Sequence, residues 1–220
     1  EPATGAEVSA LLADPSARFA SGGGAAKLLA GGTAVVLLLQ QKLIRPAALV
    51  SLGRVEGLQG IAVDAEGALR VGAMASLAQV AADERVRRGW PLLAMACAEV
   101  GNVRVRNQAT LGGNMAEADY ASDPPAALIS LDGYVRIVGP RGERQAALAE
   151  FFLGFYTTTL AEDELLIEIV VPPLPSPASS AYLKFKSRSS EDRPCVGVAT
   201  VLAVEDGVCT LARVAVGAAC

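Results

Sequence analysis

The stretch Val105–Asp123, with the sequence VRNQATLGGNMAEADYASD, decides how the rest of the chain is interpreted. Paired glycines allow a backbone turn with positive φ and let its N–H groups approach a ligand closely. Several N–H groups aimed together form a nest that binds anions. The stretch therefore predicts a ligand-binding loop, whose candidate contacts are Thr110, Leu111, Gly112, Gly113, Asn114 and Asp123.

A second stretch, Leu28–Val36 (LLAGGTAVV), repeats this pattern of an apolar run, a small-residue turn and another apolar run. We expect a strand over 26–30, a helix over 34–42 and a further strand over 48–52, which together form a βαβ-like unit. Its turn would present N–H groups at a helix N-terminus, where a phosphate is favoured. Two such turns fit a ligand with two linked phosphates. The candidate contacts here are Ala30, Gly31, Gly32, Thr33 and Ala34.

The composition narrows the possible functions. The 220 residues are 52% hydrophobic, which is typical of a packed globular protein, and the net charge of −4 argues against nucleic-acid binding. The sequence contains no histidine, which excludes Ser-His-Asp and Cys-His nucleophile systems and His-ligated zinc. We therefore expect no catalytic side chain of the protein's own, and a bound cofactor that carries the chemistry.

Four widely separated cysteines, without a Cys-x-x-Cys pair, predict free thiols in a reducing compartment and no metal site. No apolar run is long enough for a membrane span, and no signal peptide is visible at the start. The expected location is the cytoplasm.

Elsewhere the pattern predicts a succession of short elements. Ser76 and Gln79 have the spacing of a helix capping box. The segment 172–180 (PPLPSPASS) is typical of a linker. The other expected elements are helices over 6–13 and 92–100, a hairpin of 60–64 with 68–72, and strands over 134–138, 165–171, 181–187, 196–204 and 210–216.

Five stretches carry a family resemblance, because they occur in one order and with consistent spacing. They are LLAGGTAVVLLLQQKLIRPAALVSLGRV from Leu28, LRVGAMASLAQV from Leu69, VRNQATLGGNMAEADYASDPPAALISLDG from Val105, ELLIEIVVP from Glu164 and AYLKFKSR from Ala181. Over about Leu28 to Arg213, the chain resembles the FAD-binding medium subunit of the molybdenum hydroxylases. That family includes xanthine dehydrogenase, aerobic carbon monoxide dehydrogenase and bacterial aldehyde dehydrogenases.

The resemblance implies an α+β fold: a two-lobed FAD-binding cradle of the vanillyl-alcohol oxidase-like type, followed by a C-terminal lobe of the carbon monoxide dehydrogenase flavoprotein type. The expected divisions are 1–52 for the first lobe, 53–173 for the second, 174–180 for a linker and 181–220 for an incomplete C-terminal lobe. By the same resemblance, both glycine stretches hold the pyrophosphate, Asp123 lies near the cofactor, Leu166 contacts the flavin and Lys184 lies close to its ring. The chain departs from the family pattern at Ala34, Arg104, Ala109 and Tyr120; we expect Tyr120 near the flavin.

The implied function is electron transfer. FAD would receive electrons from two-iron two-sulfur clusters on a small partner subunit, while a large partner subunit holds the molybdenum cofactor. It would pass them to NAD, a quinone, dioxygen or another acceptor, in a heterotrimer or its dimer. The alternatives are a self-contained FAD-dependent oxidase or reductase, and a non-catalytic nucleotide-binding assembly module.

Each residue also has a simpler interpretation when taken alone. Asp123 before Pro-Pro is typical of a turn, and Leu166 is typical of a core residue. The alternation around Lys184 also fits a half-buried strand. Arg104 and Arg106 fit either a solvated loop or a contact with a partner subunit.

Overall fold

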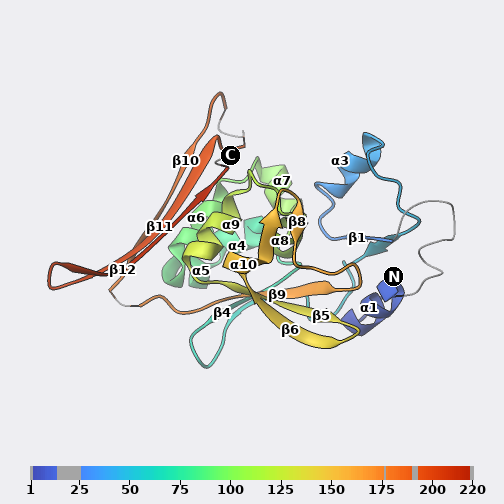
Figure 1. The fold of residues 1–220 in the computed structure, drawn as a ribbon, viewed down its shortest axis with the longest axis horizontal. Coiled ribbons are helices and arrows are strands. Elements are labelled where there is room, and N and C mark those ends of the chain that lie inside the picture. Colours follow the sequence, from blue (N-terminus) through green and yellow to red (C-terminus); the bar gives the residue numbers. More distant parts are fainter. Residues whose placement is uncertain (1, 14–25, 176, 190–192, 219–220) are drawn as a thin grey trace.

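The computed structural model describes residues 2–13, 26–175, 177–189 and 193–218, which form an α+β fold (Figure 1). A group of short helices lies in the middle of the molecule, between a five-stranded sheet and a three-stranded sheet. Within the described residues, no helix is long and apolar enough to cross a membrane.

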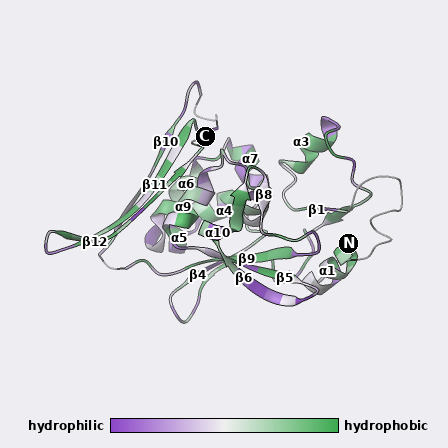
Figure 2. Ribbon diagram, in the orientation of Figure 1, coloured by the Kyte–Doolittle hydropathy of each residue, from purple (hydrophilic) through white to green (hydrophobic). Residues whose placement is uncertain are grey.

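The five-stranded sheet forms the floor of the molecule, with neighbours antiparallel throughout. It confirms the hairpin and both strands expected in this region. Figure 2 shows that the central strand β9 is hydrophobic and the edge strand β6 is hydrophilic, as expected for a strand exposed to water. The order is β3 (Ile61–Val63), β4 (Leu69–Gly72), β9 (Leu165–Val171), β5 (Tyr134–Gly139) and β6 (Gly142–Ala147).

The central helices are short, and four of the six begin at a side-chain cap. Ser76 and Gln79 form the predicted capping box of α4, and the side chains of Asp83, Asn102 and Thr110 cap α5, α7 and α8. Such caps satisfy amide groups that lack a partner in the first turn. The helices are α4 (Leu77–Ala82), α5 (Glu84–Gly89), α6 (Pro91–Ala98), α7 (Val103–Gln108), α8 (Leu111–Glu117) and α9 (Asp123–Ser130).

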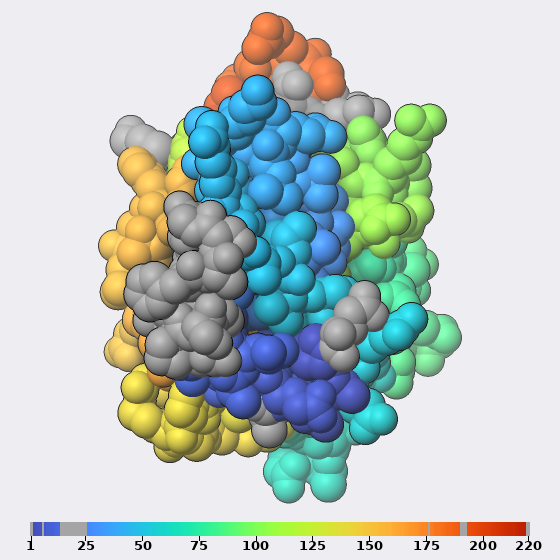
Figure 3. All heavy atoms as spheres, turned by 90° about the vertical axis from the view of Figure 1, so that its right-hand side faces the viewer, coloured from blue at the N-terminus to red at the C-terminus, as the bar shows by residue number. Residues whose placement is uncertain are grey.

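The predicted βαβ-like unit is present at one end of the molecule. Strands β1 (Lys27–Leu29) and β2 (Leu49–Ser51) pair in parallel, and α3 (Val35–Gln40) lies between them in sequence. Helix α1 (Gly5–Ala13) packs nearby against β5 and β9. Figure 3, turned to face this end, shows the blue β1–α3–β2 unit above α1, with the later green and yellow segments on either side.

The C-terminal part is a three-stranded antiparallel meander of β10 (Ser179–Phe185), β11 (Val196–Glu205) and β12 (Val208–Gly217). It confirms the three expected strands, although β10 begins two residues earlier than predicted. Ala199 and Val201 point from β11 into the main core, which places this sheet against α9. The sequence did not predict α10 (Leu148–Phe151) or the small hairpin of β7 (Phe152–Gly154) and β8 (Thr157–Thr158).

The prediction of a positive-φ turn at Gly112 and Gly113 is wrong. Both glycines lie in the first turn of α8, which Thr110 caps by accepting a hydrogen bond from the Gly113 N–H at 3.1 Å. Glycine is needed at 112 for a different reason, because a Cβ there would lie 2.5 Å from the Ala73 Cβ and 2.7 Å from its carbonyl oxygen. The second glycine stretch is therefore a close packing contact between α8 and the segment after β4.

We expect Gly112→Ala to lower the free energy of unfolding by about 1–3 kcal/mol, because the added methyl group overfills this contact. Urea unfolding followed by circular dichroism measures the effect. The matched control is Gly89→Ala at the end of α5, where a Cβ meets nothing within 4 Å. Equal stability of the two variants would contradict the packing role of Gly112.

Candidate functional site

A cavity of about 930 Å³ lies where the β1–α3–β2 unit meets α8, α9 and the end of the five-stranded sheet. The structure brings twelve of the thirteen predicted site residues to its walls, and the exception, Leu111, is fully buried in the core. The twelve are Ala30, Gly31, Gly32, Thr33, Ala34, Thr110, Gly112, Gly113, Asn114, Asp123, Leu166 and Lys184.

The first glycine loop offers a row of unused amide donors. Within the described residues, the backbone N–H groups of residues 31–34 have no hydrogen-bond partner in the protein. Gly32 adopts φ +75°, which a residue with a side chain rarely does. Unpaired amide groups on a cavity wall suit an anionic ligand that accepts several hydrogen bonds.

The first loop is pressed against the backbone that leads into the second. A Cβ on Gly31 would overlap the Gln108 carbonyl group, coming within 2.7 Å of its carbon atom and 3.1 Å of the Ala109 Cα. Glycine at this position therefore lets residues 30–34 lie directly on the junction between α7 and α8. The two predicted loops are neighbours, although about 80 residues separate them in sequence.

The second glycine stretch uses its amides internally, so the prediction that they form an anion-binding nest is wrong. The Leu111 and Gly112 N–H groups donate to the Ala75 and Ala73 carbonyls, both at 2.9 Å, and those of Gly113 and Asn114 return to Thr110. What this stretch presents to the cavity is polar side chains. Asn114 Oδ1 accepts a hydrogen bond from Ser122 Oγ at 2.9 Å, and its Nδ2 has no partner among the described residues.

Asp123 and Lys184 form a buried ion pair on the cavity wall, with side chains only 3% and 2% exposed. Lys184 Nζ donates to Asp123 Oδ2 and to the Glu99 carbonyl, both at 2.8 Å. The Tyr182 hydroxyl donates to the other carboxylate oxygen at 2.6 Å. Burial raises the pKa of Tyr182, and the hydrogen bond to Asp123 raises it further, so the phenol stays protonated.

Asp123 is not a turn residue, because it is the first residue of α9. Lys184 lies on β10, which confirms the strand that its sequence pattern predicts. The same residue also lines the cavity. Leu166 serves both as core and as wall, since it is largely buried and also lines the cavity.

Arg106 has an internal role. Its Nη1 donates to the carbonyls of Val100 and Gly101 at 3.0 and 2.9 Å, and both of those residues line the cavity. The Arg106 side chain therefore holds a segment of the wall in place, a role that neither of the expected alternatives included. Arg104 is exposed, and its two alternatives stay open.

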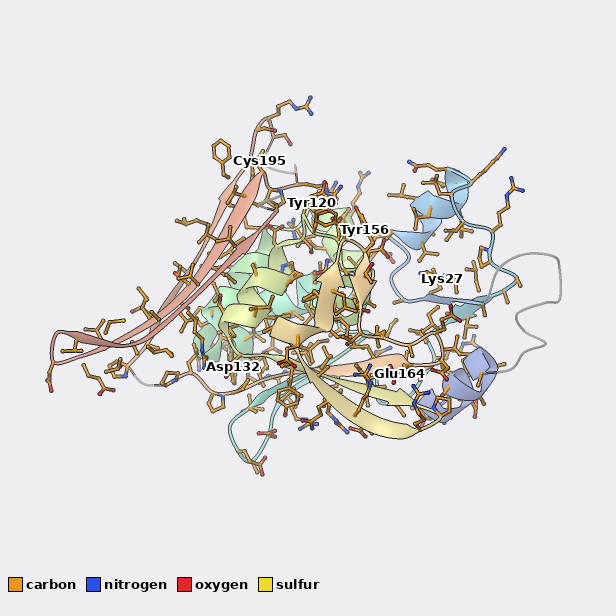
Figure 4. The ribbon with its side chains drawn as sticks, viewed as in Figure 1. Lys27, Tyr120, Asp132, Tyr156, Glu164 and Cys195 are labelled. Carbon is orange, nitrogen blue, oxygen red and sulfur yellow. The ribbon has the colours of Figure 1, made fainter. Side chains whose placement is uncertain are left out.

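Sequence reasoning missed several wall residues with polar groups, among them Lys27, Glu117, Tyr156 and Arg193. Figure 4 shows Lys27 on β1 and Tyr156 on the hairpin of β7 and β8. Burial raises the pKa of Glu117, and the charge of Lys27 partly offsets this. Apart from the aromatic pair Phe155-Tyr156 between Gly154 and Thr157, no local pattern points to them.

Tyr120 is not among the wall residues. Its ring packs against Phe155 and Tyr156, with centroids 4.8 and 6.3 Å away, and the Arg193 guanidinium lies over it at 5.4 Å (Figure 4). Arg193 also pairs with Asp119 and donates to the Tyr156 hydroxyl at 3.3 Å. Tyr120 therefore supports the cavity wall indirectly, by packing against the wall residues Tyr156 and Arg193.

A carboxylate with a strongly shifted pKa holds another part of the wall. Arg144 donates to both oxygens of Glu164, at 2.9 and 2.6 Å, and the Ala161 N–H donates to one of them. The Arg144 hydrogen bonds lower the pKa of Glu164 to about 2, against the opposing effect of burial. Glu164 therefore fixes the segment around it, in which residues 160–162 and 164–166 line the cavity.

Because the folded pKa of Glu164 lies below its unfolded value, its stabilisation is present above about pH 5 and is lost as the pH falls toward 2. With allowance for screening at the partly exposed Arg144, we expect Glu164→Gln to lower the free energy of unfolding at pH 7 by about 2 kcal/mol.

Urea unfolding between pH 7 and 3 checks this, and the variant should lose less stability over that range than the parent. Glu66→Gln, in the exposed turn between β3 and β4, is the control and should change stability by less than about 0.5 kcal/mol. Parallel pH profiles for the parent and Glu164→Gln would show that the Arg144 pair contributes nothing.

The chain matches known proteins over most of its length. The family described as the FAD binding domain in molybdopterin dehydrogenase matches residues 1–174. The alpha subunit of the 6-hydroxypseudooxynicotine dehydrogenase complex of Paenarthrobacter nicotinovorans is 34% identical over 176 residues, which are 80% of this chain and 59% of that protein. The putative xanthine dehydrogenase FAD-binding subunit of Escherichia coli (strain K12) is 31% identical, with coverage of 78% and 59%.

Among solved structures, the carbon monoxide dehydrogenase of Hydrogenophaga pseudoflava that lacks the Mo-pyranopterin moiety of its molybdenum cofactor matches with a TM-score of 0.90 at 31% identity. The match covers 98% of this chain and 72% of that one. The chain spans about three fifths of the length of these curated relatives.

Proposed function

The chain belongs to the family of FAD-binding domains of molybdopterin dehydrogenases, and we propose that it is the FAD-binding electron-transfer subunit of a molybdenum hydroxylase. The observation that carries this proposal is the row of unpaired amides at residues 31–34 on the wall of the cavity. Its volume of about 930 Å³ suits a large ligand such as a dinucleotide.

The donor set fits a diphosphate better than a single neutral group. The amides of residues 31–34 and the Thr33 hydroxyl would hold the phosphate oxygens, with the Asn114 side-chain amide as a further donor. Lys27 adds a positive charge on the same wall. In this arrangement the stretch around Gly31 supplies main-chain donors. The stretch around Gly112 supplies the Asn114 side chain, and the backbone before it at Gln108 packs against Gly31.

The flavin ring would lie toward the opposite part of the wall, where Leu166 offers an apolar surface and Lys184 a buried ammonium group. FAD, when bound, supplies the redox chemistry of its ring system. The protein's part is to bind and orient the cofactor and to set the charge around it. No acid–base group of the chain is required for this role.

We assign residues 1–52 and 53–173 to the two lobes of a vanillyl-alcohol oxidase-like FAD cradle. The expected linker of 174–180 overlaps β10, which begins at Ser179, so we shorten the linker to 174–178 and assign the strands that follow to a carbon monoxide dehydrogenase flavoprotein-type lobe. The position of the cavity between the β1–α3–β2 unit and the larger body supports this division.

The relatives are subunits of larger enzymes, and we extend this assembly to the present chain. A small subunit with two-iron two-sulfur clusters would deliver electrons, and a large subunit would hold the molybdenum cofactor. NAD, a quinone or dioxygen would accept the electrons from FAD. The free thiols Cys97, Cys195 and Cys209 favour a cytoplasmic location; Cys220 lies outside the described residues.

We expect the protein to bind FAD and Gly31→Ala to weaken that binding at least about tenfold, a loss of roughly 1.4 kcal/mol. The added Cβ overlaps the Gln108 carbonyl and must displace the loop that carries the free amides. Titration of the purified protein with FAD, followed by flavin fluorescence, measures the affinity. Gly89→Ala is the control and should bind as the parent does. A parent protein without affinity for FAD would overturn the proposal and favour an assembly module.

Purification from the native host should yield this chain together with an iron–sulfur subunit and a molybdenum subunit. Metal analysis and flavin extraction should find iron, molybdenum and FAD in one complex. A protein that purifies alone and oxidises a substrate with its own flavin would favour the self-contained oxidase or reductase instead.

A further inference from the structure

We infer that Tyr182 is a positioning residue, which fixes the net charge that the Asp123–Lys184 pair presents to a bound flavin. The inference rests on the proposed function and adds a residue that does not itself line the cavity. It is carried by a buried chain of contacts that runs from β11 through β10 to α9 and α6.

Among the described residues, each oxygen of the Asp123 carboxylate accepts one hydrogen bond. Lys184 Nζ holds Oδ2 at 2.8 Å, and the Tyr182 hydroxyl holds Oδ1 at 2.6 Å. The two donors stand two residues apart on β10, so they point to the same side of the strand. One strand of the C-terminal sheet therefore supplies both partners of a carboxylate that belongs to α9.

The position of Tyr182 is built into the sheet. Its partner residue on β11 is Ala199, and Gly197, which is the β11 partner of Lys184, leaves the space that the tyrosine hydroxyl occupies. A Cβ on Gly197 would overlap the hydroxyl oxygen of Tyr182 and lie 3.3 Å from its Cζ atom. Gly197 does not adopt a positive φ. Glycine is therefore needed at this position for space and not for backbone conformation.

The other charged and titratable groups near the pair are few. Lys184 also donates to the Glu99 carbonyl at the end of α6, and the Glu99 carboxylate pairs with Lys186. From α6, Cys97 is fully buried, and its pKa is raised by burial and by the charge of Asp123, so the thiol is neutral. Within the described residues, the charge at this part of the wall is therefore set by Asp123 and Lys184.

The hydroxyl of Tyr182 withdraws part of the negative charge of Asp123 from the cavity. Without it, the carboxylate is less compensated and opposes the ammonium charge of Lys184 more strongly. Reduction adds negative charge to the flavin, so a less positive wall stabilises the reduced form less. Loss of the hydroxyl should therefore make the reduction potential of the bound flavin more negative.

The experiment compares Tyr182→Phe with the parent protein, each purified with the subunits that accompany it. The phenyl ring keeps the packing of β10, and only the hydroxyl is lost. We expect unchanged flavin content and a more negative flavin potential in a spectroscopic redox titration. Tyr134→Phe on β5, away from the cavity walls, is the matched control and should leave the potential unchanged.

A second pair of variants tests the geometry itself. Gly197→Ala displaces the Tyr182 hydroxyl without removing it, so it should shift the potential in the same direction as Tyr182→Phe. In the Tyr182→Phe background the overlapping oxygen is gone, so adding Gly197→Ala should cause no further shift. Additive shifts in the double variant would overturn the proposed contact.

The outcomes distinguish a failure of the proposed function from a failure of the inference about Tyr182. A parent protein that holds no flavin overturns the proposed function and this inference together. A parent protein that holds FAD, with the same potential in Tyr182→Phe, overturns the inference alone. A loss of flavin in Tyr182→Phe, while Tyr134→Phe retains it, would show that Tyr182 supports binding and not charge, and would also overturn the inference.

Discussion

The contact on which the cavity depends is between two stretches of backbone, at Gly31 and Gln108. The carbonyl of Gln108 occupies the space where a side chain at position 31 would begin. Because no side chain separates them, the first loop rests on the junction of α7 and α8 and cannot slide along it. That contact fixes where the β1–α3–β2 unit meets the larger body, and so determines the width of the cavity between them. Elsewhere, side-chain hydrogen bonds within the larger body hold the wall in place. Arg106 bonds the Val100 carbonyl, and Arg144 bonds Glu164.

The two glycine stretches are similar in sequence but require glycine for different physical reasons. In the first, Gly32 takes a positive φ and the surrounding amides stay free. In the second, Gly112 permits close packing on Ala73, and the amides are consumed by a helix cap and by neighbouring carbonyls. A glycine pair signals that a side chain is not tolerated, without saying whether conformation or space is the reason. This is why sequence analysis located both stretches on the cavity wall but assigned the wrong backbone to the second.

The parts that sequence predicted well depend on local chemistry. The capping box at Ser76, the hairpin around residues 60–72 and the parallel βαβ-like unit follow from patterns within a few residues. Short helices such as α7 and α8 were missed because neither is long enough for an apolar repeat to appear. The rim formed by Tyr156 and Arg193, and the pairing of Asp123 with Lys184, join residues that are 37 and 61 positions apart. Such contacts depend on the packing of whole elements.

The C-terminal sheet is part of the site and not an appendage to it. It approaches α9 and α6 with β10 and β11, and it brings Lys184 to a wall that, apart from Arg193, is otherwise built from residues before position 175. A lone lysine with 2% exposure would be costly to bury, and so would a lone aspartate with 3%. Each element therefore needs the other: among the described residues, β10 supplies the cation that pairs with the carboxylate of α9, and α9 and the end of α6 supply the acceptors for the ammonium group of β10. Docking of the sheet and completion of the cavity are, on these grounds, one event.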